Sequence, residues 1–251
     1  LSIASMMAVS SVTAARLTEG ASGPESVLVV LLVLALGALM GAANGALIVW
    51  TRLPDIVVTL AMLFVWEGVA LLVLSAPGGA AAPWLRGLLV GHVGLPILPK
   101  ALVVLVVCLA LVWLPLRRSR LGLSIYAIGS DPVAAFRSGV AIGPTRVAAY
   151  AVAGLLAAMG GLSLTAGTGI GEPIPGPYLL ASVAAVVLGG VALTGGRGGL
   201  LGPILAVFIL RLVRLDLTLL AIDPNVTAIV EGTIMAVVVM LGGLLLVRGR
   251  S

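Results

Sequence analysis

Few residues of this 251-residue chain could take part in chemistry. The sequence holds one histidine, His92, one cysteine, Cys108, and one lysine, Lys100. Metal motifs built on paired histidines and disulfides within the chain are therefore excluded. A phosphate-binding loop ends in Gly-Lys-Ser/Thr, but the glycine-rich stretch at 195–202, GGRGGLLG, has no lysine. The residue types predict no cofactor, no metal site and no catalytic centre, and they exclude a P-loop ATPase.

The composition instead predicts a protein solvated by lipid. Apolar residues make up 61% of the chain and charged residues 9%, with a mean hydropathy of +1.28. A soluble globular domain has about 25% charged residues, so this chain has too few charges to cover a water-facing surface. Disorder, nucleic-acid binding and a disulfide scaffold are excluded by the same numbers. The excess of 14 Lys and Arg over 9 Asp and Glu is typical of membrane topology signals.

Several apolar stretches approach or exceed the roughly 20 residues that a membrane helix needs. They span residues 26–51, 56–74, 101–116, 147–166, 179–194, 200–222 and 226–247. With the apolar segment at the start of the chain, they predict about eight membrane segments. The predicted fold class is an all-α polytopic membrane protein, a multi-helix transmembrane bundle with discontinuous or short helices. We expect one transmembrane domain over residues 1–251, with its N-terminal helix or helices missing because the sequence opens inside an apolar segment.

The arginines predict the orientation in the membrane. If the loop at 117–146 is cytoplasmic, alternation of the segments leaves only Arg16, Arg86 and Lys100 on the outer side. The arginines then on the inner side are Arg52, Arg117, Arg118, Arg120, Arg137, Arg146, Arg197, Arg248 and Arg250. This asymmetry agrees with the positive-inside rule.

Within the inner loop, the residues Asp131-Pro132 predict the start of a short helix. An acidic N-cap followed by proline at the first helical position is a common beginning, and Gly139 is a suitable stop. The predicted helix covers residues 132–138.

This short helix is expected to carry Val133 and Phe136 on one face. Such a helix, presented on a loop, could insert into a groove on a partner protein. It could equally lie on the lipid headgroups as an interfacial helix. The residue pattern alone does not separate the two interpretations.

Four stretches of the sequence carry a family resemblance. Tyr126-Ala127-Ile128-Gly129, followed by Asp131-Pro132, Ala134-Ala135 and Arg137-Ser138-Gly139, is similar to a Y-A-I-G-x-N-x-x-A-A-x-x-S-G-I segment. The others are LSIASMMAVSSV at 1–12, GAANGALIVWTRLPDIVVTLAML at 41–63 and LASVAAVVLGGVALTGGRGGLLGPILA at 180–206. In order and spacing they resemble the ribose-type permease subunits of ABC importers, a superfamily that includes monosaccharide and branched-chain amino-acid permeases.

The resemblance implies a permease in the plasma (inner) membrane of a prokaryote, importing a monosaccharide or related polar solute. Its expected partners are a second permease subunit, identical or related, two ATPase subunits, an extracytoplasmic solute-binding protein and membrane lipid. Nucleic acid is not among them. The loop at 117–146 would be the cytoplasmic coupling loop. Its ATPase-coupling residues would be Tyr126, Ile128, Gly129, Asp131, Pro132, Val133, Ala134, Ala135, Phe136, Arg137, Ser138 and Gly139.

Polar residues at membrane depth are costly, by about 2.5–3.5 kcal/mol for a charge, so each needs a reason. Those that could line a solute pathway are Asn44, Glu67, Arg211, Arg214, Asp216 and Glu231. Alternatively, the helix that contains Arg211 breaks there and its charges lie in the outer interface, and the glutamates pair with arginines. Asn44 is expected to be an interhelical hydrogen-bond partner rather than a ligand. Arg197 is expected at a cytoplasmic turn, within reach of an ATPase.

Small residues at a spacing of four predict close helix packing. They form two sets, Gly37, Gly41 and Gly45, then Ala153, Ala157 and Gly161. In lipid such ridges let helix backbones approach each other.

Two other function classes remain open at this stage. An ion-coupled secondary transporter would need paired membrane carboxylates, for which Glu67 and Glu231 are the candidates. An intramembrane enzyme would need a nucleophile–base pair, which the sequence does not offer.

Overall fold

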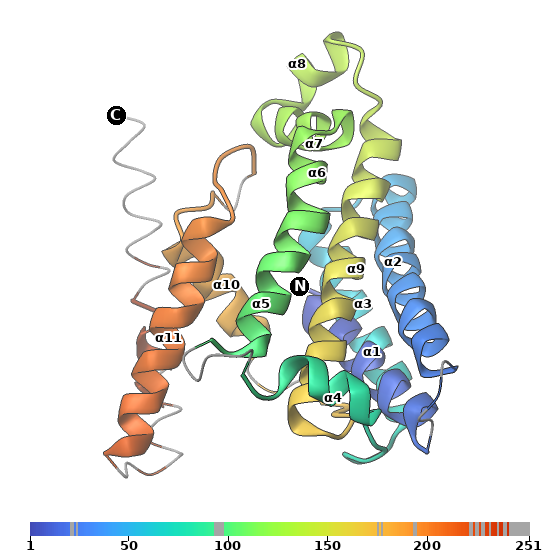
Figure 1. Cartoon of the computed structure of the whole chain (residues 1–251). Helices are drawn as coiled ribbons and strands as arrows, with labels where there is room; N and C mark the ends of the chain where they lie inside the picture. The colour runs from blue at the N-terminus through green and yellow to red at the C-terminus, as the bar shows by residue number, and fades with distance from the viewer. Residues whose placement is uncertain are drawn as a thin grey trace. The chain divides into compact units, whose positions relative to one another are not determined.

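The computed structural model describes residues 1–20, 23, 25–92, 98–174, 176, 178–192, 195–220, 223, 226, 229, 230, 232–234, 236, 237 and 240. Within this part of the chain, all regular secondary structure is helical (Figure 1). Four helices are long and apolar enough to cross a membrane: α2 (Glu25–Thr51), α3 (Asp55–Val73), the helical rod Lys100–Arg118 and α9 (Ile142–Thr168). The predicted all-α polytopic membrane class is confirmed.

Three further predicted segments form shorter or less apolar helices. α1 (Ile3–Thr18) and α10 (Tyr178–Leu188) are apolar but too short to cross a membrane alone. The 11 residues of α10 span only about 16 Å, roughly half the hydrocarbon core. The predicted stretch at 200–222 forms α11 (Leu201–Leu219), whereas the stretch at 226–247 lies largely outside the described residues.

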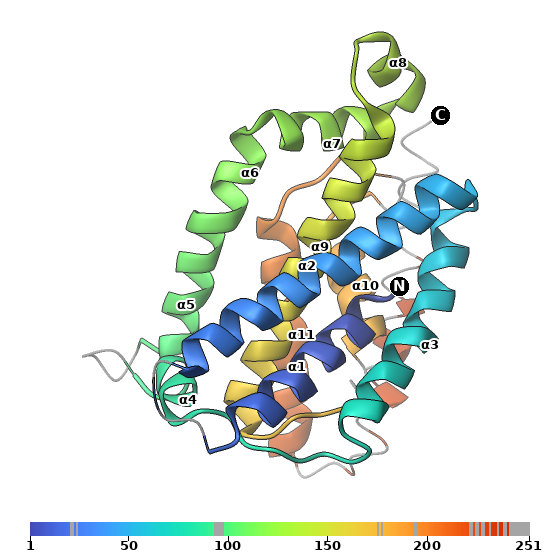
Figure 2. The same ribbon diagram turned by 90° about the vertical axis from the view of Figure 1, so that its right-hand side faces the viewer.

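The chain divides into two compact units. The first comprises Leu1–Ile125 and Phe136–Gly176, and the second comprises Tyr126–Ala135 and Pro177–Ser251. In the first unit α2 and α9 lie side by side, and α1 packs against α2, α3 and α9 (Figures 1 and 2).

The α2–α9 contact depends on missing side chains. A Cβ atom on Gly41 would overlap the carbonyl oxygen of Tyr150, and one on Gly37 would lie 2.6 Å from the carbonyl oxygen of Gly154. The predicted ridge on α2 is therefore a close-packing surface. On α9 the residues that contact α2 are Gly154 and Ala158, which were not in the predicted set. Of the predicted residues, Gly161 faces α1 and Ala157 packs in the cluster with Met6 and Met40.

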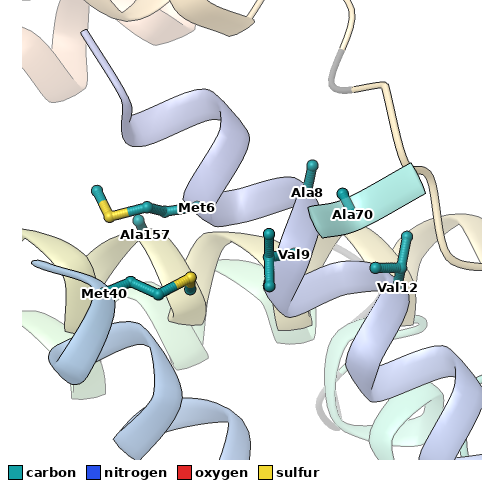
Figure 3. Packing of buried hydrophobic residues seen from close by; sticks show 7 residues of the cluster. All are labelled: Met6, Ala8, Val9, Val12, Met40, Ala70 and Ala157. Atoms are coloured by element: carbon teal, nitrogen blue, oxygen red, sulfur yellow. The ribbon is translucent and has the colours of Figure 1, made fainter. Parts of the chain in front are cut away.

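The core of the first unit surrounds α1, whose residues are mostly small. Met6 and Met40 reach toward Ala157 of α9, and Ala8 lies beside Ala70 of α3 (Figure 3). The buried hydroxyls of α1 are satisfied locally or across helices. Ser11 Oγ lies 2.8 Å from Thr165 Oγ1 of α9. Because lipid gives no hydrophobic drive between helices, such small-residue packing and hydrogen bonding hold the bundle together.

One end of the first unit is closed by the loop that follows α3. Gly78 exchanges backbone hydrogen bonds with Gly171, and Ala80 N donates to Ala15 O. A short helix, α4 (Pro83–Leu89), lies across this end (Figure 1). Lys100 and the α4 residue Arg86 are at this end, because Lys100 Nζ donates to Gly87 O.

At the opposite end, Arg146 pairs with Asp55, at the starts of α9 and α3. Arg52 follows α2 at the same end. Arg52 and Arg146 therefore lie at one end of the first unit, and Arg16, Arg86 and Lys100 lie at the other. This grouping agrees with the predicted orientation, which puts the first two inside and the other three outside.

The rod Lys100–Arg118 is helical throughout but not uniform. It consists of α5 (Lys100–Cys108), a π-helical turn η1 (Leu109–Trp113) and α6 (Leu114–Arg118). The widened turn lies directly before Pro115, whose ring would clash with the carbonyl of residue 111 in a regular α-helix. The predicted inner loop is itself largely helical. α7 (Arg120–Ser130) was not expected from the sequence and runs across the end of the rod (Figure 2).

In the second unit α10 packs against α11, and a glycine-rich turn joins them. Positive φ angles at Gly195 (+88°), Gly196 (+74°) and Gly198 (+128°) let the backbone reverse direction. α11 continues without interruption through Arg211, so the expected break at that residue is wrong. Position 211 lies about 15 Å along the helix from its start.

Candidate coupling site

The predicted short helix is present as α8 (Pro132–Arg137), one residue shorter than expected. Asp131 caps it, because the backbone N–H groups of Val133 and Ala134 donate to Asp131 Oδ1 at 2.8 and 3.1 Å. Gly139, with φ of +83°, ends the segment. The cap, the proline and the glycine make this helix a locally determined, rigid element.

The face of α8 predicted to be apolar is exposed. Val133 is 60% and Phe136 67% exposed, while Ala135 is buried. Arg137 and Ser138 are exposed beside this face. An exposed apolar face on a short helix can dock into a groove on a partner or rest on the lipid headgroups, the two interpretations that the sequence left open.

The structure brings this segment into contact with the glycine-rich turn. Within the second unit, Tyr126 Oη donates to Gly198 O at 3.1 Å. Ser130 Oγ lies 3.4 Å from Gly196 O and donates to Tyr126 O at 3.0 Å. We call the contact of Tyr126, Gly129 and Ser130 with Gly195–Gly198 the glycine joint.

Glycines make the joint possible on both sides. A Cβ atom on Gly129 would overlap Gly196 N and lie 3.0 Å from Gly196 Cα. A Cβ atom on Gly196 would lie 2.5 Å from Ser130 N. The two backbones therefore touch directly, and no side chain larger than hydrogen fits between them.

The sequence predicts the two halves of the joint separately. It assigns Tyr126, Ile128 and Gly129 to coupling and Arg197 to a cytoplasmic turn, and it predicts no contact between them. Arg197 is exposed in the turn, and its carbonyl oxygen accepts a hydrogen bond from Ala192 N at 3.1 Å. The only signal in the sequence was the glycine requirement, since positive φ angles and close backbone approach both favour glycine.

The charged residues of α11 lie on an intact helix. Arg211, Arg214 and Asp216 are exposed on it. The Arg211 guanidinium carbon lies 5.9 Å from the ring centre of Tyr178, the first residue of α10. This cation–π contact partly compensates the charge, and it places an arginine beside the start of a half-length helix.

The remaining intramembrane candidates are dispersed. Asn44 is fully buried and joins three helices. Its Nδ2 donates to Ser2 Oγ at 2.7 Å, and Trp66 Nε1 donates to its Oδ1 at 3.1 Å. This agrees with the interhelical interpretation. Glu67 is half-buried on α3, and Glu231 lies outside the described residues.

The comparison with known proteins assigns the class. The family described as "Branched-chain amino acid transport system / permease component" matches residues 1–239, and the chain belongs to this family. Among curated proteins it is similar to the "Autoinducer 2 import system permease protein LsrD" of Escherichia coli (strain K12) and of Shigella flexneri. Each is 31% identical over 225 residues, which cover 87% of this chain and 68% of the relative. No solved structure matches the chain significantly.

The family resemblance predicted from the sequence is therefore confirmed. The chain is a multi-pass inner-membrane transport subunit, the permease of an ABC importer. Permeases of this family act together with ATPase and solute-binding subunits.

Proposed function

We propose that this permease imports a monosaccharide or a related polar solute and is driven by two separate ATPase subunits that grip α8. A second permease subunit, identical or related, completes the pathway, and an extracytoplasmic binding protein delivers the solute. The chain itself hydrolyses no ATP, in keeping with the missing lysine in the stretch at 195–202. The similarity to an autoinducer 2 import permease supports a small polar solute.

The observation that supports ATPase coupling is the exposed apolar face of the capped helix α8. A docking helix must stay folded when a partner pulls on it. The N-cap Asp131 and the terminating Gly139 stabilise α8 through its own neighbouring residues. Val133 and Phe136 offer an apolar anchor to a groove. Arg137 lies beside them, where it can meet an acidic rim on the partner.

The glycine joint supplies a route for the movement into the membrane. Tyr126 and Gly129 touch the turn that joins α10 to α11, and the second unit holds both. ATP-driven closure of the ATPase pair would displace α8, and the joint would transmit that displacement to the α10–α11 hairpin. The hairpin would then alternate between inward-open and outward-open arrangements.

The pathway itself would pass the start of α10. Short helices that end within the bilayer are characteristic of transporter binding sites. Arg211 and Tyr178 offer a guanidinium and an aromatic ring there, two groups that bind hydroxylated solutes. Arg214 and Asp216 would extend the polar lining along α11, while Asn44 is already fully engaged within the bundle.

The proposal is tested by replacing Phe136, the exposed aromatic residue of α8. The full complex of permease, partner permease, ATPase and binding protein is purified and placed in proteoliposomes. In the variant Phe136→Asp a carboxylate would have to enter the apolar groove without a partner, so solute-stimulated ATP hydrolysis should fall more than about tenfold. Arg137→Glu should give a similar loss.

The control is Phe136→Leu, which keeps an apolar side chain and should retain most of the activity. Co-purification of the ATPase, which needs no knowledge of the solute, should be weak for Phe136→Asp and normal for Phe136→Leu. Uptake of labelled pentoses, hexoses and autoinducer 2 identifies the solute class. Normal ATPase binding and hydrolysis in Phe136→Asp would refute the coupling role. Uptake that survives without ATP but collapses with an ionophore would favour ion-coupled transport.

A further inference from the structure

A pocket of about 250 Å³ opens between the end of α2 and the start of α9. It lies in the first unit, and none of its lining residues is among those assigned to ATPase coupling or to the pathway, although Ile142, Gly143 and Arg146 are at the end of the loop at 117–146. Its lining is apolar apart from two arginines: Ile48, Val49, Arg52, Leu53, Ile142, Gly143 and Arg146. A pocket of this composition suits a ligand that has an anionic headgroup next to an apolar part.

The charge on this pocket is positive. Arg146 pairs loosely with Asp55, at 3.3 Å from Nη2 to Oδ1, and Tyr150 Oη also donates to that carboxylate. Within the described part of the chain, the Arg52 guanidinium has no hydrogen bond or ion pair. One positive charge thus remains uncompensated, and the Arg146 guanidinium keeps donors available for an anion.

The backbone at Arg52 is unusual. It is the one residue other than glycine with a positive φ, +57°, among those that the structure describes. For a side chain of this type the left-handed conformation costs about 1–2 kcal/mol. The conformation ends α2 and leads directly into Leu53-Pro54, so Arg52 is held at the rim of the pocket.

The lengths of α2 and α9 would place the pocket at the level of the lipid headgroups. α2 and α9 each have 27 residues and span about 40 Å, so their ends project beyond a hydrocarbon core of about 30 Å. Trp50, two residues from Arg52, is 82% exposed, as is typical of the aromatic belt at a membrane surface. Leu53 and Ile56 are exposed on the same connection. By the positive-inside rule this end faces the cytoplasm.

We propose that this pocket binds the phosphate of an anionic phospholipid from the cytoplasmic leaflet, between Arg52 and Arg146. The acyl chains would lie along the exposed apolar surface beside Trp50. Basic pockets between transmembrane helices on the cytoplasmic side are suited to such headgroups. The volume is below the 300–1,000 Å³ typical of sites for drug-sized ligands, so it suits a headgroup better than a nucleotide.

The test uses the complete transporter in nanodiscs after exchange of its native lipid. Phosphatidylglycerol retained per complex is measured by native mass spectrometry. In Arg52→Gln the retained lipid should fall more than about tenfold, because the charge-assisted hydrogen bonds from the guanidinium to the phosphate are lost. Phosphatidylcholine should be retained poorly by the wild type. Added inorganic phosphate should not displace phosphatidylglycerol, because the acyl chains contribute to binding.

Two further variants test whether the lipid binds in the pocket or is attracted by the positive charge of the surface in general. Arg118→Gln removes an exposed arginine that does not line the pocket, and it should change retention less than about twofold. Gly143→Leu keeps both arginines but fills the pocket, since a Cβ there would already lie 3.4 Å from Val49 Cγ1, and retention should fall. The proposal is overturned if Arg52→Gln and Gly143→Leu retain as much phosphatidylglycerol as the wild type. Displacement by inorganic phosphate would overturn it in favour of a free-anion site.

Discussion

Substituting Gly129 tests whether the glycine joint carries the movement of α8. Gly129 is in α7, where alanine is intrinsically better than glycine by about 1 kcal/mol. The variant Gly129→Ala should therefore fold with α7 intact. Its Cβ atom, however, would overlap Gly196 N and lie 3.1 Å from Gly195 C, both of them backbone atoms that cannot rotate away. The clash should open the joint without unfolding the helix.

The expected size of the effect follows from the geometry. Forcing one extra methyl into a packed contact costs about 1–3 kcal/mol. If the joint must be closed for α10 and α11 to follow α8, coupled transport should fall by about fivefold to more than a hundredfold. Tyr126→Phe removes only the hydrogen bond to Gly198 O, which contributes about 0.5–1.5 kcal/mol, so its loss should be smaller.

The assay compares solute uptake with ATP hydrolysis in proteoliposomes. Gly129→Ala should keep ATPase binding through α8 but lose uptake per ATP hydrolysed. Gly199→Ala is the matched control, because Gly199 is in the same glycine-rich turn but a Cβ there meets nothing within 4 Å. It should transport normally. Normal uptake by Gly129→Ala, or equal losses in both variants, would refute the idea that the joint transmits movement.

Two predictions concern the stability of the first unit and use thermal unfolding of the purified permease in detergent. Gly41→Ala places a Cβ against the carbonyl of Tyr150 and should lower the free energy of unfolding by about 1–3 kcal/mol. The control Gly68→Ala has open space around its Cβ and should not lower it. Equal melting temperatures of the two variants would contradict close α2–α9 packing. Asn44→Ala leaves the Trp66 indole N–H without an acceptor, and Trp66→Phe leaves the buried Asn44 Oδ1 without that donor, so each should cost about 1–2 kcal/mol. The double variant removes both partners and should cost less than the sum; additive losses would contradict the hydrogen bond.

The sequence was sufficient for those features that depend on local chemistry. The apolar stretch at 26–51 became α2, and the stretch at 147–166 became the central part of α9, because length and hydropathy alone decide a membrane helix. The α8 helix followed from Asp131, Pro132 and Gly139, which act on their own neighbours along the chain. The same holds for the glycine ridge of α2.

Features that depend on distant parts of the chain could not be predicted. The partner of Gly129 is Gly196, which is 67 positions away, and neither stretch contains a pattern that indicates contact with the other. The expected break at Arg211 was wrong for a related reason. The cost of a charge at membrane depth argued against a continuous helix, but Tyr178 of α10 provides a compensating contact that only the tertiary structure reveals. α7 could not be predicted from local preference, because it contains Gly122 and Gly129, and glycine is unfavourable inside a helix.

The helices differ in how much of their length is buried, and this difference bears on the proposed mechanism. α1 of the first unit buries most of its length, and its neighbours meet it through glycine and alanine contacts that tolerate no added atoms. In the second unit α10 buries Ala184 and Ala185, and α11 buries Ala206, within the residues described. The rod Lys100–Arg118 of the first unit has no buried residue. Regions with few buried contacts open and shift at lower free energy than densely packed cores. An importer needs a fixed frame and a moving part, and in the proposed mechanism α1 and its neighbours would form the frame while the α10–α11 hairpin, held at the glycine joint, would be the part that the ATPase moves.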